Sequence, residues 1–169
     1  MTHPFSFLLL LLLIFSSKLP GYAQTSATNT AEEQVKQVVY TLFDGMRAGD
    51  SSMIRPLFAQ GVILASCFER EGKSQMRSGD IENFIRAVGS PHEEVWDEKI
   101  WDLEVRVDDN MATAWMKYAF FRGEQFSHCG VNNFVLFHSD TGWKIVHLMD
   151  TRRQSPCPLP DKYAYPAGG

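Results

Sequence analysis

The chain has 169 residues and a formal net charge of −4, with 44% hydrophobic and 12% aromatic residues. This length is typical of one domain, and the apolar content is sufficient for a packed core. The acidic balance offers no counter-charge to a phosphate backbone, so nucleic acid and anionic membrane surfaces are excluded as expected partners. These numbers favour a single globular domain.

The N-terminus carries an apolar run, Phe7 to Phe15, which is too short to cross a bilayer but has the length of a signal-peptide core. Gly21 and Ala23 are small residues at the positions three before and one before a cleavage point after Ala23. We therefore expect residues 1–23 to be a signal peptide, followed by a polar lead-in over 24–30. The mature protein would be secreted or periplasmic, without stable membrane insertion.

Export would place Cys67, Cys129 and Cys157 in an oxidising compartment, where disulfides form. Because three is an odd number, at least one thiol stays free or pairs between chains, and the sequence does not choose the partners. The histidines lack metal-ligand spacing and the chain has no CxxC pair, so no metal site is expected. No motif indicates a cofactor.

A long first helix is predicted from its capping residues and its apolar spacing. Thr30 and Glu33 match a capping box, which satisfies two backbone donors at a helix start. Apolar residues from Val35 to Met46 recur at helical spacing, and Gly49 supplies the stop. This pattern indicates one buried helix face.

Two shorter helices are predicted around an apolar strand. Asp50 is expected to cap the second helix, which Gly61 ends, and the strand Val62 to Phe68 follows. Glu69 to Gly79 reads as a charged loop, after which Asp80 caps a third helix.

From Val95 the hydrophobic period changes from helical to two, which predicts strands joined by hairpin turns. Four strands are expected, over Glu94–Val107, Met111–Phe121, Phe126–His138 and Trp143–Asp150. Helices followed by a meander predict an α+β domain over residues 31–153: a cone-shaped fold with three N-terminal helices packed on a strongly bent, mainly antiparallel sheet. Residues 154–169 form a Pro-rich C-terminal tail.

The tight turns fix a provisional register, from which each face of the sheet can be read by parity. One face is apolar and is expected to meet the helices: Trp101, Leu103, Val105, Val107, Ala112, Ala114, Met116, Tyr118, Phe120, Cys129, Val131, Asn133, Val135, Phe137, Val146, Leu148 and Asp150. The other face mixes aromatic and charged residues: Asp102, Glu104, Arg106, Thr113, Trp115, Lys117, His128, Asn132, Phe134, Leu136, Trp143, Ile145 and His147.

Tyr118, Asn133 and Asp150 are polar tips on the apolar face, where a buried polar group needs a hydrogen-bond partner or a ligand. One interpretation is a small-molecule pocket with a few orienting groups. The other is that Asn133 and Asp150 cap local backbone and that Tyr118 is a core ring reaching solvent; for Asp150 this second interpretation is favoured. His128 and His147 fall on the mixed face, as surface or interface residues.

The order of elements, with the motifs FSHCGVN (Phe126–Asn132), GWKI (Gly142–Ile145) and DTRR (Asp150–Arg153), resembles the nuclear transport factor 2-like superfamily. The resemblance covers Glu32 to Arg153, and the motifs are similar to those of its SnoaL-like, lumazine-binding branch in bacteria. It implies an α+β cone, a pocket between sheet and helices, and a homodimer formed through the outer sheet face. The fold hosts many activities, so the motifs do not specify one.

The catalytic residues of ketosteroid isomerases, which belong to this superfamily, can be compared with the residues of this chain. The resemblance places their acidic base near Ala65 to Cys67, where no carboxylate stands, and their helix tyrosine near Leu42. Their oxyanion-hole acid would fall near Asn133. Dehydratase and cyclase relatives use a His and Asp pair inside the cone, and His128 and His147 have the wrong parity for that role. No complete acid–base set is visible.

Three hypotheses follow. The first is an exported domain, with little or no catalysis, that binds a small, largely apolar or aromatic molecule lined by Trp101, Met116, Tyr118, Cys129 and Asn133. The second is an enzyme of the lyase, cyclase or isomerase kind, with His128 or His147 as general base. The third is an interaction module whose outer sheet face pairs two copies or docks a partner through Trp115, Phe134 and Trp143.

Overall fold

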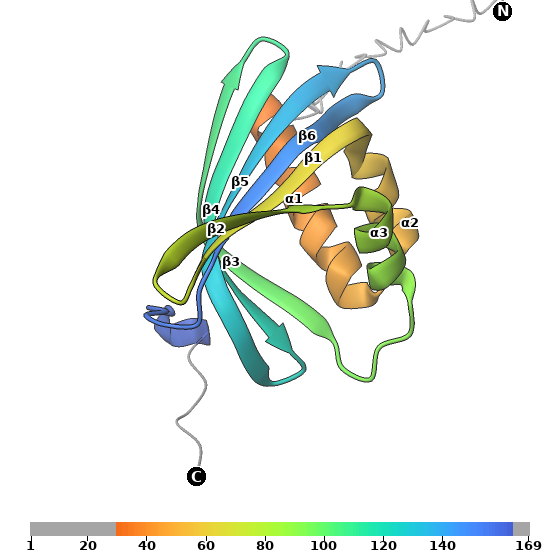
Figure 1. Ribbon diagram of the computed structural model, residues 1–169. Coiled ribbons are helices and arrows are strands. Elements are labelled where there is room, and N and C mark those ends of the chain that lie inside the picture. The colour runs from red at the N-terminus through yellow and green to blue at the C-terminus, as the bar shows by residue number, and fades with distance from the viewer. Residues whose placement is uncertain (1–29, 164–169) are drawn as a thin grey trace, which may run out of the picture.

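The computed structural model describes residues 30–163, so the predicted signal peptide over 1–23 lies outside the described residues. Three helices lie on one side of a strongly curved six-stranded sheet (Figure 1): α1 (Ala31–Ala48), α2 (Ser51–Ile54) and α3 (Ile81–Gly89). The strands are β1 (Phe58–Arg70), β2 (Lys73–Gly79), β3 (Trp96–Asp108), β4 (Met111–Arg122), β5 (Gln125–Ser139) and β6 (Gly142–Arg152). The α+β cone predicted from the sequence is confirmed.

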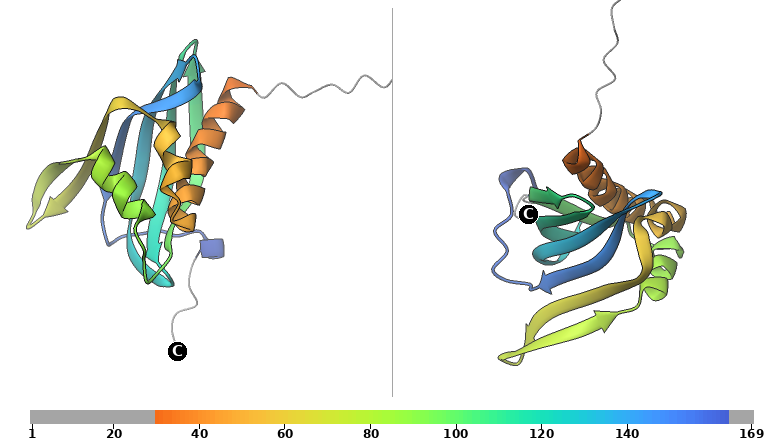
Figure 2. Two further views of the ribbon diagram at one scale, coloured as in Figure 1. Left: turned by 90° about the vertical axis from the view of Figure 1, so that its right-hand side faces the viewer. Right: turned by 90° about the horizontal axis from the view of Figure 1, so that it is seen from above.

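The strand order is β2-β1-β6-β5-β4-β3, and β1 pairs with β6 in parallel while every other pair is antiparallel. The last four strands form the predicted meander. Figure 2 shows the sheet bending around the helices, with the β1–β2 hairpin projecting beyond the other strands. Two short 3-10 helices, Arg55–Leu57 and Asp161–Tyr163, complete the described chain.

The predicted helix caps form at α1 and α3. The Thr30 side chain accepts a hydrogen bond from the Glu33 amide at 3.3 Å, and Gly49 ends α1 with a φ of 66°. The Asp80 carboxylate accepts from the Asn83 amide at 2.7 Å. Each cap satisfies a backbone donor that the first helical turn leaves open.

Two predicted boundaries in the first half are wrong. The second helix ends at Ile54, and Gly61, with a φ of 74°, lies inside β1 at an irregularity in its pairing with β6. The predicted loop Glu69–Gly79 contains β2, which pairs back onto β1. Every residue of β2 is exposed, so no alternating apolar pattern marks it as a strand.

Three β-bulges set which side chains face the helices. A bulge places one extra residue in a strand and reverses the faces on either side of it. In β3 the extra residue lies at Asp102, which has a φ of 52°. In β5 it is Ser127, and in β6 it is Val146.

The bulges correct part of the predicted register. On β4 the predicted inward residues, from Ala112 to Phe120, do face the core. On β5 the prediction is wrong, because the extra residue turns Asn132, Phe134 and Leu136 inward and Cys129, Asn133 and Phe137 outward. On β6, Leu148 and Asp150 face inward as predicted, and so do Trp143 and Ile145, which were assigned to the outer face.

The main core lies between α1 and the concave face of the sheet. From α1 it takes Val35, Val39, Leu42, Phe43 and Met46, all at most 7% exposed. A second cluster lies on the convex face, where Ala119, Phe121 and Cys129 pack with Trp101, Phe126, Cys157 and Leu159. The Cys129–Cys157 disulfide fixes the tail there, on the side of the sheet away from the helices (Figure 1), and Cys67 is free.

Candidate functional site

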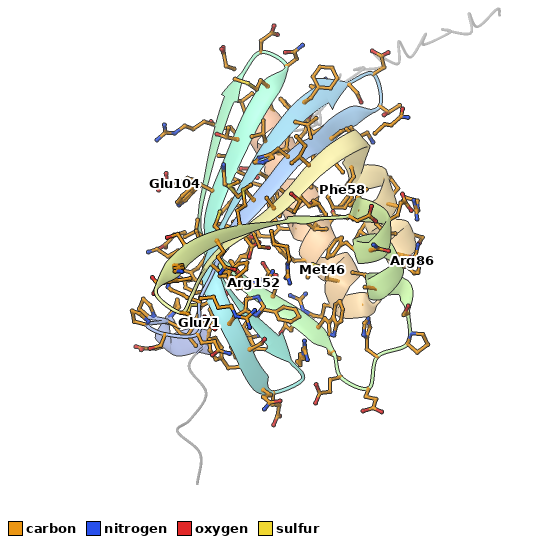
Figure 3. All side chains as sticks on the ribbon, viewed as in Figure 1. Met46, Phe58, Glu71, Arg86, Glu104 and Arg152 are labelled. Atoms are coloured by element: carbon orange, nitrogen blue, oxygen red, sulfur yellow. A yellow bond between two sulfur atoms is a disulfide. The ribbon has the colours of Figure 1, made fainter. Side chains whose placement is uncertain are left out.

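A cavity of about 200 Å³ lies between the helices and the concave face of the sheet. Most of its wall is apolar, and is formed by Leu42, Phe43, Met46, Leu64, Phe84, Phe134 and Leu148. The polar residues that line it are Ser66, Asp80, Glu98, Tyr118, Asn132, Asp150 and Arg152. Figure 3 shows Met46 of α1 and Arg152 of β6 on the two sides of the space between helix and sheet.

Asp150 is the centre of one polar cluster at this cavity. It is 5% exposed and accepts hydrogen bonds from Tyr118 Oη at 2.8 Å, Ser66 Oγ at 2.5 Å and Arg152 Nε at 3.2 Å. Ser66 and Asp150 are direct neighbours on the parallel strands β1 and β6. Three donors, one of them charged, compensate the burial of a carboxylate. Asp150 therefore does not serve as a local backbone cap.

Tyr118 reaches the same cluster from β4. Burial and the nearby Asp150 carboxylate raise the pKa of Tyr118 far above its usual range. The phenol therefore stays protonated and donates, with Asp150 Oδ2 as one acceptor and the Thr151 carbonyl, at 3.0 Å, as the other. The interpretation of Tyr118 as a core ring reaching solvent is wrong, because the residue is 1% exposed.

Glu98 is a second carboxyl group at the cavity. It belongs to β3, before the bulge at Asp102, and faces the helices. Its Oε1 accepts a hydrogen bond from Asn132 Nδ2 at 2.6 Å. Burial raises the pKa of Glu98 from 4.5 to about 7, Asp150 adds to that rise, and the Asn132 hydrogen bond opposes it. Both the acid and the carboxylate are therefore populated near neutral pH.

The five predicted ligand-binding residues divide between the two faces of the sheet. Tyr118 lines the cavity and Met116, fully buried, faces the helices, as predicted. Trp101 and Cys129 lie on the convex face against the tail, and Asn133 lies between Trp115 and Met149 on that face. Their predicted position on the cone face is wrong, because the bulges in β3 and β5 reverse the parity.

The same bulges hid Glu98 and Asn132 from sequence reasoning. A signal was present in β3, where the apolar residues change from even to odd numbers between Ile100 and Leu103. Such a change within one strand is typical of a bulge. In β5 no such signal exists, because both parities are apolar from Val131 to Phe137, apart from the two asparagines.

The two candidate histidines lie on different faces. His128 is opposite Phe120 on the concave side, where its ring packs against Tyr118 at 5.7 Å, so its predicted placement on the mixed face is wrong. It lines a wider groove next to the cavity, with Arg152 between the two spaces. Burial and Arg152 lower the pKa of His128 from 6.5 to about 4, so the ring is neutral at physiological pH. His147 lies outward, between Ile63 and Val135.

The three residues predicted to form the dimer surface do not lie on one face of the sheet. Trp115 is 50% exposed on the convex face, whereas Phe134 and Trp143 are buried in the main core. Other exposed apolar residues lie on the same face of the sheet, namely Met111, Phe137 and Ile63.

In residues 30–163, no group of three or more His, Cys, Asp or Glu side chains is arranged to hold a metal ion. None of the helices in this part of the chain has both the length and the apolar character needed to span a membrane.

Solved structures with the same architecture identify the fold. An NTF2-like protein of unknown function from Pseudomonas putida has a TM-score of 0.58 and 14% identity, with 72% of this chain and 85% of that chain covered. A "putative dehydratase" of the NTF2-like family from Streptomyces avermitilis has a TM-score of 0.56 and 17% identity, covering 75% and 98%. An NTF2-like protein of unknown function from Shewanella baltica has a TM-score of 0.54 and 15% identity, with 72% of this chain and 93% of that chain covered. The chain thus has the nuclear transport factor 2-like fold.

Within that superfamily the sequence matches one family over residues 30–149, and the family's description reads "Putative lumazine-binding". The chain belongs to this family, which confirms the resemblance seen in its motifs. None of the curated proteins compared with the chain matches it.

Proposed function

We propose that this domain binds a small, mainly apolar or aromatic molecule in the cone cavity, with a polar edge directed at Glu98 and Asp150. The observation that carries the proposal is the cavity itself, whose apolar walls meet a few hydrogen-bonded polar groups. This combination is the usual construction of a small-molecule site. An apolar cavity of about 150 Å³ holds benzene, so about 200 Å³ suits one or two fused rings.

The charges around the cavity narrow the class of ligand. Asp80, Glu98 and Asp150 line it together with one cation, Arg152, which is already paired with Asp150. An anionic ligand would meet an excess of carboxylates, so we propose a neutral ring with hydrogen-bond donors or a carbonyl. Lumazine, the neutral bicyclic pteridine named in the family description, is a suitable first probe.

Titration calorimetry with lumazine, and with naphthalene as a purely apolar probe, tests the proposal. Leu64→Trp would fill the cavity from β1, whereas Ile63→Trp adds the same ring one residue away, at a position that is 60% exposed. We expect Leu64→Trp to abolish binding and Ile63→Trp to leave it unchanged. Equal binding by both variants, or no binding of either probe by the natural chain, would contradict the proposal.

The geometry gives less support to a histidine general base. His128 lies beside the cavity rather than on its wall, and a group with a pKa of about 4 is a weak proton acceptor at neutral pH. His147 lies on the opposite face of the sheet.

We also propose that two copies associate through the convex face. Met111 and Phe137 are paired across β4 and β5, and Trp115 lies further along β4 on the same face. These three side chains are 44–52% exposed. A group of exposed large apolar residues is typical of a protein interface. The role predicted for Trp115 is retained in this proposal, and those predicted for Phe134 and Trp143 are not.

Export of the mature chain is proposed on two grounds. The first is the signal-like N-terminus, and the second is the Cys129–Cys157 disulfide, since such bonds persist in oxidising compartments. Mass spectrometry of protein from the extracellular or periplasmic fraction should give a chain that starts after Ala23, with one disulfide. A cytoplasmic, uncleaved chain would contradict export.

A further inference from the structure

We infer that the ligand of this domain has two parts: a neutral ring held in the cone cavity, and a flexible anionic arm that extends past Arg152 into the adjoining groove and ends in a phosphate or a carboxylate. This inference rests on the proposed binding function and deepens it, because it names the class of ligand. Its basis is the way in which charged residues divide between the two spaces.

The cavity and the groove adjoin at Arg152. This residue lines the cavity of about 200 Å³ and also the groove, whose volume is about 1030 Å³. On β1 the two spaces follow each other along the strand, because Ser66 lines the cavity and the next residue, Cys67, lines the groove. In the view of Figure 3, Arg152 lies between Met46 of α1 and the tip of the β1–β2 hairpin, which carries Glu71. A ligand that fills the cavity and extends beyond it at this point therefore enters the groove.

The balance of charge is opposite in the two spaces. Three carboxyl groups and one cation line the cavity, whereas two cations, Arg152 and Arg153, and one carboxylate, Glu69, line the groove. His128 also lines the groove, but burial and Arg152 lower its pKa to about 4, so the ring is neutral at physiological pH. Charge complementarity therefore favours a neutral group in the cavity and a negative group in the groove.

Arg153 supplies the donors that are open to an anion. It is exposed, and its Nε donates to the Pro156 carbonyl at 3.0 Å. Within residues 30–163 it pairs with no carboxylate, whereas Arg152 is paired with Asp150. A guanidinium carries five N–H donors in a planar fork that matches a phosphate or a carboxylate. The donors on the two terminal nitrogens of Arg153 can therefore bind the end of the arm.

Neutral polar residues form much of the remaining groove wall. They include Ser74 and Gln75 of β2, and Gln154 and Ser155, which follow β6. Hydroxyl and amide groups donate hydrogen bonds to the oxygen atoms of an anion. The groove thus suits a polar arm, whereas the mostly apolar wall of the cavity suits a ring.

Three probes with one ring and similar arms test the inference: naphthylpropanol, naphthylbutanoate and naphthylpropyl phosphate. The arm of the first is neutral, and the arms of the others end in a carboxylate and a phosphate, both ionised at about pH 8. Titration calorimetry measures the affinity of each probe. We expect the anionic probes to bind about tenfold more tightly than the alcohol. A gain for only one of the two identifies that anion as the end of the arm, and no gain for either overturns the inference.

Arg153→Gln should remove this gain while leaving the affinity for naphthylpropanol unchanged. Arg106→Gln is the matched control, because it removes one positive charge from an exposed residue of β3 that faces away from the core. The control should bind all three probes like the natural chain. An equal loss in the two variants, or no loss in either, would show that Arg153 does not hold the arm and would overturn the inference.

Glu69→Gln should have the opposite effect, because it removes the carboxylate of the groove. We expect the anionic probes to bind this variant about threefold more tightly. Glu104→Gln removes one negative charge from the outer face of β3 (Figure 3) and should change nothing. A local loss of structure would weaken binding in every variant, so a loss in Arg153→Gln with a gain in Glu69→Gln has an electrostatic cause. Equal affinities of Glu69→Gln and Glu104→Gln contradict the arm.

Leu64→Trp separates failure of this inference from failure of the binding proposal. If naphthylpropanol binds the natural chain but not Leu64→Trp, and the anionic probes bind no more tightly, the arm is refuted and cavity binding stands. If only the anionic probes bind and Leu64→Trp leaves their affinity unchanged, the groove binds anions without the cavity, and both proposals are refuted. Tighter binding of an anionic probe that is lost in Leu64→Trp and reduced in Arg153→Gln supports both.

Discussion

Asn132 and Asn133 are adjacent in the sequence but have different surroundings. Asn132 is 4% exposed and donates to Glu98, whereas Asn133 lies on the convex face next to Trp115. Counting by two along the strand places Asn133 on the cone face, whereas the structure places Asn132 there. The count is one residue off because Ser127 adds one residue to the strand upstream. The side chain that reaches the cavity is thus set by a bulge five residues earlier in the strand, about 17 Å away along the chain.

Asn132→Leu is expected to raise the pKa of Glu98 above about 7, because the Asn132 hydrogen bond stabilises the carboxylate. Asn133→Leu makes the same chemical change on the other face and should leave that pKa unchanged. An NMR titration of the glutamate side-chain carboxyl carbons measures both. If the two variants shift the Glu98 titration equally, the assigned register of β5 is wrong.

Glu98→Gln is expected to stabilise the protein at alkaline pH. The folded-state pKa of about 7 lies above the usual 4.5, so the folded state holds its proton more tightly, and stability falls as pH rises from 4.5 to 7. The full effect is about 3 kcal/mol at most. Urea unfolding should show Glu98→Gln more stable than the natural chain at about pH 8 and little different at about pH 4. A constant difference at both pH values would contradict this.

At the scale of elements, periodicity and capping residues predicted the helices and the meander, because these elements depend on local interactions. The caps of α1 and α3 depend on residues three positions apart, and the meander on two-residue turns, so the sequence displays both. The strand β2 was missed because its side chains are all exposed, and its pairing to β1 provides its only regularity. The bulges are harder to predict: the one in β3 changes the parity of the apolar residues, whereas the one in β5 lies in a strand where both parities are apolar.

The predicted faces are correct for the part of the site on β4 and for Leu148 and Asp150 of β6. Tyr118 and Met116 belong to the one long strand that has no extra residue, so counting by two placed them correctly. Trp101 and Cys129 lie beyond a bulge, and the same counting placed them on the wrong face. Ser66 and Arg152 join the cavity through the parallel pairing of β1 with β6, which no turn in the sequence specifies.

Gly130 of β5 lies where the strand closely approaches Thr151 of β6 and Tyr118 of β4. A Cβ at this position would lie 1.7 Å from the Thr151 carbonyl oxygen and 2.9 Å from Tyr118 Cε1, so the backbone of β6 would have to move. We expect Gly130→Ala to lower the free energy of unfolding by about 3 kcal/mol. Gly72→Asn in the β1–β2 turn is the control, because a Cβ there meets nothing within 4 Å and Asn tolerates the left-handed backbone. Equal urea midpoints for the two variants would contradict the close approach.

At the scale of the whole molecule, the two faces of the sheet have different surroundings. The concave face and helices enclose the cavity, while the convex face holds the tail at one end and exposes Trp115, Met111 and Phe137. A second copy could therefore cover the convex face without closing the cavity or contacting the helices.

Trp115→Lys is expected to convert a dimer into a monomer, because it places a charge within the proposed interface. Met53→Lys is the matched control, since Met53 is 37% exposed on α2, on the helix side of the sheet. Size-exclusion chromatography with light scattering measures the mass of each. A natural chain that stays monomeric at high concentration, or a Trp115→Lys variant that stays dimeric, would refute the convex-face dimer.

The parallel pairing of β1 with β6 also determines when this chain can fold. During synthesis β1 emerges before the meander and has only β2 beside it, because the strand that joins it to the meander is β6, the last of the six strands in chain order. Contacts of such long sequence separation form late and slowly. The nascent chain therefore cannot complete its sheet until β6 has been synthesised, and until then β1 exposes an unpaired edge.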